Sequence, residues 1–117
     1  MAGMTQAMQQ QALDNVFADT DYIAWASDSS GTPAAVPRTA VGDWGAASAA
    51  TPSVKSNAAP LTSAAATGAT DVTHWATFSA STGGVQKSTW EPVDNPRSLL
   101  TGDTLTVAAG SLRHTLD

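Results

Sequence analysis

The chain has 117 residues, of which 42% are hydrophobic and only 13% are charged, so it is long enough for one globular domain with a single core. It has no cysteine, which excludes a disulfide framework and a thiolate zinc site. A formal net charge of −5 with five scattered basic residues argues against a nucleic-acid partner, and no apolar run is long enough to predict a membrane span.

The N-terminal region predicts the one convincing helix, over residues 4–17. Apolar residues recur four apart there, and Leu13 lies one turn before Phe17. Thr5 is the candidate N-cap, and the acidic segment 19–21 should end the helix. The segment has neither the basic start nor the apolar core of a signal peptide, so we expect a protein made in the cytoplasm.

The predicted helix is short and nearly uncharged, so its apolar stripe must be covered by protein. Its first half relies on Met4 and Met8, whose flexible side chains suit an adaptable contact, while its larger apolar residues lie near its end. We therefore expect the first half to dock on a neighbouring subunit and the second half to pack on its own domain. The predicted boundaries are 1–20 for the helix and 21–117 for a β-domain.

Two stretches predict strong strands, at residues 22–27 and 71–80. The second places Trp75 on one face and Phe78 on the other, so we expect both faces to be covered and both rings to lie in the core. The turn residues 81–84 should return the chain as a hairpin into residues 85–90. The two prolines of residues 91–96 then exclude a central strand and predict an edge strand or an exposed excursion.

The remaining segments predict shorter strands. Residues 104–108 and 111–116 alternate apolar and polar side chains around a turn at Ala109 and Gly110, and 37–44, 53–57 and 58–63 are weaker candidates. Turn signals every eight to twelve residues without alternating helices indicate a mainly β fold. We predict an antiparallel β-sandwich, jelly-roll-like or a small barrel, with one N-terminal α-helix.

The residues predict no catalytic, metal or cofactor site. There is no Gly-x-Ser-x-Gly elbow, and His74 and His114 stand alone on predicted strands, so each is interpreted as a hydrogen-bonded structural histidine. The carboxylates Asp19, Asp21 and Asp28 lack the spacing of a calcium loop and are interpreted as turn and cap residues. We therefore do not expect an enzyme.

The four tryptophans are the strongest candidates for partner contact. Trp25 and Trp75 lie in strong strands and are assigned to the core, whereas Trp44 and Trp90 border loops. Core burial is the default for these two also, with a half-exposed anchor for a partner as the alternative. The candidate partner-binding residues are Met4, Met8, Trp44 and Trp90.

The order of short motifs resembles a family of small virion proteins of tailed bacteriophages that are labelled head decoration, head fibre or minor tail proteins. The motifs are YIAW at 22–25, RTAV at 38–41, WGAAS at 44–48, SNAA at 56–59, VTHW at 72–75, STGG at 81–84 and GDTLTVAAG at 102–110. The resemblance implies a non-enzymatic capsid decoration protein, a homotrimer bound to the major capsid protein on the capsid exterior. The alternative that it implies is a minor tail or fibre-like protein that binds the host surface.

Overall fold

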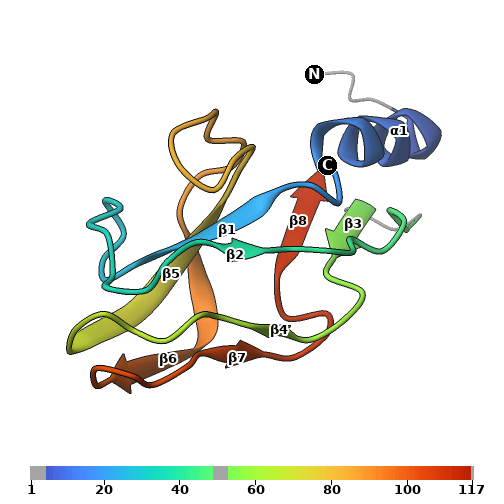
Figure 1. The fold of residues 1–117 in the computed structure, drawn as a ribbon. Helices are drawn as coiled ribbons and strands as arrows, with labels where there is room; N and C mark the ends of the chain where they lie inside the picture. The colour runs from blue at the N-terminus through green and yellow to red at the C-terminus, as the bar shows by residue number, and fades with distance from the viewer. Residues whose placement is uncertain (1–4, 49–52, 117) are drawn as a thin grey trace.

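The computed structural model describes residues 5–48 and 53–116, the last by its backbone alone. In these ranges the chain forms one helix and eight strands (Figure 1). The elements are α1 (Gln6–Val16), β1 (Tyr22–Ala26), β2 (Thr39–Ala40), β3 (Ser53–Ser56), β4 (Leu61–Thr62), β5 (Thr70–Phe78), β6 (Glu91–Leu99), β7 (Thr106–Val107) and β8 (Arg113–Leu116).

All strand pairs are antiparallel, and the largest sheet has the strand order β2-β1-β5-β6. Its centre is the pairing of β1 with β5, in which Trp25 lies opposite Trp75. Two further two-stranded sheets, β3-β8 and β4-β7, form a bent ribbon that packs across this sheet (Figure 1). The prediction of a mainly β, antiparallel fold with one N-terminal helix is confirmed.

Helix α1 begins where a cap was predicted. The Thr5 side-chain hydroxyl accepts a hydrogen bond from the backbone N–H of Met8 (3.3 Å), which satisfies one of the free donors of the first turn. The helix ends at Val16, and Phe17 is its C-cap. Gln9 and Leu13 are buried because α1 packs on β3 and β8. Gln9 lies in the first half, so that half also packs on its own domain.

The predicted hairpin after β5 is short, and strand β6 pairs with the rest of β5. Its residues were expected at an edge or outside the sheet, and they form the long outermost strand beside β5. Residues 85–87 return along the end of β5 as expected, because Gln86 bridges Phe78, the Ser79 N–H donates to the Val85 carbonyl and the Lys87 N–H donates to the Thr77 carbonyl. An edge strand tolerates prolines because it needs hydrogen-bond donors on one side only. The pairing of β6 with β5 also shifts register between Val72 and His74, as at a β-bulge.

The C-terminal strands differ from the expectation. They were predicted as neighbouring strands joined by a turn, but β7 pairs with β4 and β8 with β3. Asn57 explains this arrangement, because its buried side-chain amide donates to the carbonyls of Ala59 and Ala108 and accepts from the N–H of Leu112. These bonds hold a bend in the ribbon at Asn57. The chain therefore passes Gly110 and continues along the ribbon as β8, and does not fold back on β7.

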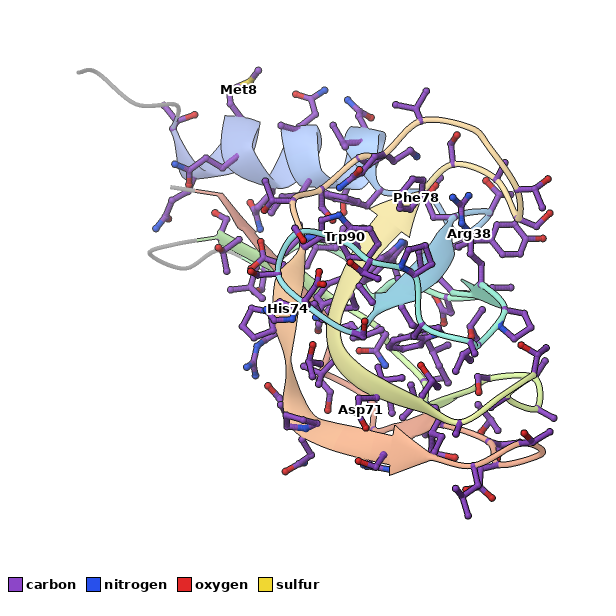
Figure 2. All side chains as sticks on the ribbon, turned by 90° about the vertical axis from the view of Figure 1, so that its left-hand side faces the viewer. Met8, Arg38, Asp71, His74, Phe78 and Trp90 are labelled. Atoms are coloured by element: carbon purple, nitrogen blue, oxygen red, sulfur yellow. The ribbon has the colours of Figure 1, made fainter. Side chains whose placement is uncertain are left out.

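The core lies between the large sheet, the ribbon and the inner face of α1. Trp25, Trp75 and Trp44 are all buried, at 3%, 2% and 4% exposure. Phe78 was expected in the core, but it is only half-buried. Its face of β5 lies toward the loops around Arg38 and Trp90 instead of the ribbon (Figure 2). Trp75 is covered as expected, by His114 of β8, at 4.9 Å between ring centroids.

Candidate partner-binding surfaces

The structure separates the four predicted partner-binding residues. Met4 lies outside the described residues. Met8 is 51% exposed on α1, and Trp90 is half-buried beside a surface pocket. Trp44 is corrected: its ring packs against Phe17 (5.9 Å) and His114 (5.3 Å), so it is a core residue and presents no surface to a partner.

Trp44 is buried because the chain after it folds back along β3. Its backbone forms a bridge with Asn57, and its N–H donates to the Asp19 carboxylate (2.9 Å). The indole N–H of Trp44 is buried and has no hydrogen-bond partner among the described residues. The sequence analysis gave core burial as the default for both Trp44 and Trp90, and for Trp44 the structure has it.

Trp90 forms one wall of a pocket of about 240 Å³. Its ring lies 6.0 Å from that of Phe78, and the Arg38 guanidinium lies over the Phe78 ring at 3.9 Å from the centroid. Arg38 also donates to the carbonyls of Ala80 and Gly83, so its head is fixed (Figure 2). Apolar walls and one held cation suit a flat ring or the apolar face of a sugar.

A glycine allows Trp90 to lie in this place. Gly31 has a φ of +90°, and a Cβ there would lie 2.3 Å from the indole nitrogen of Trp90. Any side chain at position 31 would therefore displace the indole as well as strain the backbone. The sequence signalled Trp90 by its position beside a loop, but nothing in it linked Trp90 to Gly31, Arg38 and Phe78.

A second groove, of about 320 Å³, runs along the C-terminal half of α1. Leu13 and Val16 of the helix and its C-cap Phe17 line one side, and residues 87–89, Glu91 and β8 line the other. Lys87 fixes the two sides together, because its ammonium donates to the Val16 carbonyl (2.7 Å) and the Asp21 carboxylate (2.6 Å).

His114 lies at the floor of this groove. Its ring stacks on Phe17 at 3.8 Å, and its Nε2 is 2.7 Å from the Thr77 hydroxyl. Burial lowers the pKa of His114 to about 4, so the imidazole is neutral at pH 7. Phe17, Trp44 and Trp75 pack against its ring, which is the environment of a structural histidine. His74 contacts the Thr73 hydroxyl at 2.8 Å.

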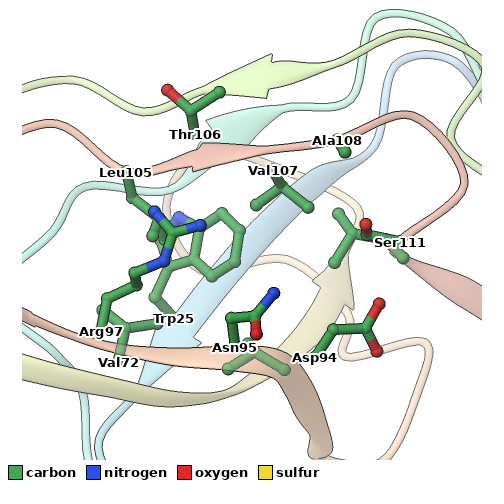
Figure 3. A pocket seen from close by; sticks show the side chains of 12 residues that line it. Trp25, Val72, Asp94, Asn95, Arg97, Leu105, Thr106, Val107, Ala108 and Ser111 are labelled. Atoms are coloured by element: carbon green, nitrogen blue, oxygen red, sulfur yellow. The ribbon is translucent and has the colours of Figure 1, made fainter.

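A smaller cavity of about 90 Å³ separates β6 from β7 (Figure 3). Trp25 and Val72 lie at its base, and the polar side chains of Asp94, Asn95 and Arg97 lie along its β6 side. The two strands pair with other strands, so this gap depends on long-range topology and had no signal in the sequence.

The carboxylates considered for calcium accept hydrogen bonds from other groups of the chain. Asp19 accepts from Trp44, Asp21 from Ala18 and Lys87, and Asp28 from the backbone N–H groups of Ser30 and Thr32. Within residues 5–48 and 53–116, no three His, Asp or Glu side chains are grouped so that they could hold a metal ion. In the same residues no helix has the length and apolar character needed to cross a membrane.

A model of the family described as "Podophage GP4 fiber I protein gp80" matches residues 18–115. The chain belongs to this family. Podophages are tailed phages, so the predicted resemblance to small virion proteins of tailed bacteriophages is confirmed. No curated protein matches the chain.

The fibre I family match contains the whole β-fold up to Thr115 but begins at Ala18. It therefore includes Trp90, Arg38 and Phe78, whereas α1 and Met8 precede it. The Trp90 pocket is thus formed by residues within the matched region, and the groove along α1 combines matched residues with the preceding helix.

Proposed function

We propose that the chain is a non-enzymatic structural subunit of a fibre on a tailed-phage particle, present in several copies that contact one another. The observation that carries this proposal is the match to a fibre I protein family across residues 18–115. The structure supports it in one respect: its notable surface features, the Trp90 pocket and the groove along α1, are suited to binding other molecules.

In this role the Trp90 pocket is the surface for contact with the host. Aromatic side chains supply much of the binding energy of interfaces, and a ring held against Phe78 loses little freedom on binding. A sugar of the host surface would lie on the apolar walls, with Arg38 beside it. Reduced adsorption of phage when Trp90 is displaced is the signature of this contact.

Capsid decoration, the first expectation from the sequence, is the second candidate. It is favoured by the size and shape of the chain, since 11.9 kDa and extents of 47 × 26 × 26 Å are suited to a small clamp on a shell. In that case a homotrimer would bind the major capsid protein on the capsid exterior, and binding to the assembled shell alone would stabilise it.

Purified particles separate the two candidates. Gold-labelled antibody against the chain should mark fibres in electron micrographs, and quantitative gel analysis should give far fewer copies than the major capsid protein. Label spread evenly over the head, with a copy number close to that of the major capsid protein, would instead establish decoration. Particles that contain none of the chain would overturn both.

A further inference from the structure

The outer face of α1 is unusual in being exposed and almost without charge. Met8 and Val16 are 51% and 46% exposed, and Ala12 lies between them on the same stripe because the three are four residues apart. Met8 points away from the sheets (Figure 2). The one charged residue of the helix, Asp14, is exposed but paired with the buried Lys55 ammonium (2.7 Å). A solvated helix face normally carries free charges.

The charge of the chain favours this face for contact between copies. Two copies each carry a net charge of −5 and repel one another at their acidic surfaces. A neutral face with apolar side chains lets two copies approach with the least repulsion, and it has apolar area to bury.

The groove beside the helix could accept side chains of the second copy. Its walls include Val16 and Phe17, and Lys87 ties the two sides together through the Val16 carbonyl and the Asp21 carboxylate. A flexible apolar side chain is what such a groove would accept.

We propose that a second copy of this chain docks here, with the two α1 helices antiparallel about a two-fold axis at Ala12. Met8 and Val16 each lie about 6 Å from Ala12 along the helix, from the rise of about 1.5 Å per residue. A two-fold axis at Ala12 therefore places Met8 of each copy beside Val16 and the groove of the other. The small side chain of Ala12 permits the helices to approach closely. The inference deepens the proposed fibre function, on which it rests, by naming the surface at which copies meet.

Cysteine cross-linking tests the geometry directly, because the natural chain has no cysteine. Under mild oxidation the full chain with Ala12→Cys should form a covalent dimer, since a residue on the axis meets its own copy within the few ångströms that a disulfide spans. Leu100→Cys is the matched control, because position 100 is also exposed (69%) and directly follows β6, whose end lies far from α1 (Figure 1). Equal cross-linking of the two variants, or none at Ala12→Cys, overturns the proposal.

Sedimentation of the uncross-linked chain tests the energetics. Met8→Glu puts a charge on the neutral face, and its dimer dissociation constant should rise about tenfold or more, whereas Leu100→Glu should behave like the natural chain. Circular dichroism confirms that each variant is folded. If Met8→Glu associates as the natural chain does while electron microscopy still finds the protein in fibres, this surface is wrong and the fibre function stands. Absence from fibres is the separate failure of the proposed function.

Discussion

At the scale of single residues, His114 joins the helix to the sheets. Its ring contacts Phe17 of the helix end, Trp44 of the loop and Trp75 of β5, and its Nε2 meets the Thr77 hydroxyl. A neutral imidazole satisfies this site, because the hydroxyl can act as its donor or acceptor. A charged imidazolium would be held in a largely apolar environment, which explains the lowered pKa.

We predict that this histidine makes stability fall in mild acid. Its pKa is about 4 in the folded chain and 6.5 when exposed, so the unfolded state binds the proton first as pH falls. The contribution is complete above pH 6.5 and is lost between pH 6.5 and 4. At about 1.4 kcal/mol per unit the loss approaches 3 kcal/mol. Urea unfolding at several pH values measures it.

Substitution of each histidine in turn isolates the effect. His114→Gln keeps a hydrogen-bonding side chain but cannot titrate, so its stability should depend less steeply on pH between 6.5 and 4 even if it is lower throughout. His74→Gln, on the half-exposed side of β5, should keep the steep dependence. An unchanged slope in His114→Gln would show that other groups cause the acid sensitivity.

A second prediction at this scale concerns Gly31 and Trp90. Gly31→Ala should displace the Trp90 indole, because the new Cβ would lie 2.3 Å from its nitrogen. Gly102→Ala is the matched control: Gly102 has a φ of +92°, close to the +90° of Gly31, but nothing within 4 Å of an added Cβ. In both variants the strained backbone should lower the free energy of unfolding by about 1 kcal/mol. Only in Gly31→Ala should the overlap with Trp90 lower it further.

The difference between these two variants is the measurement. Gly31→Ala should melt at a lower temperature than Gly102→Ala, shift one indole N–H resonance in NMR spectra, and reduce adsorption of phage that carry it. Identical melting temperatures and indole spectra would mean that Trp90 is not held against Gly31. A shifted indole with normal adsorption would remove the pocket from host contact.

At the scale of elements, the local signals predicted individual strands, the cap and the hairpin after β5, but they did not predict how the C-terminal strands pair. The Thr5 cap, the strand over residues 22–27 and the coverage of both faces of β5 follow from short-range patterns, and the structure has them. The edge position of residues 91–96 followed from the missing donors of two prolines. That β7 would pair with β4 and β8 with β3 depends on contacts with distant segments, which no local pattern encodes.

The candidate surfaces show the same limit. Met8 was found from its spacing and flexibility, and Trp90 from its place beside a loop. Trp44 has the same local context as Trp90, yet it is buried because β3 returns beside it and α1 supplies Phe17. Arg38, Phe78 and Gly31 meet Trp90 only in the folded chain, so sequence spacing could not group them.

At the scale of the whole molecule, the first and last elements of the chain lie together. Helix α1 packs on β3 and β8 through Leu13, and Phe17 stacks on His114 (Figure 1). The Lys55 ammonium, buried in β3, binds Asp14 of the helix and the Gly45 carbonyl. The helix thus covers one end of the core, and without it Phe17 and His114 would lose their apolar cover.

This closure predicts that the helix and the sheets unfold together. An 11-residue helix is marginal in water by itself, and the contacts that stabilise α1 are the same that cover Trp44 and His114. Helical circular dichroism at 222 nm and tryptophan fluorescence should therefore give the same midpoint in urea. A helix signal that is lost at lower urea, with the fluorescence transition unmoved, would make α1 a separate unit outside the cooperative core.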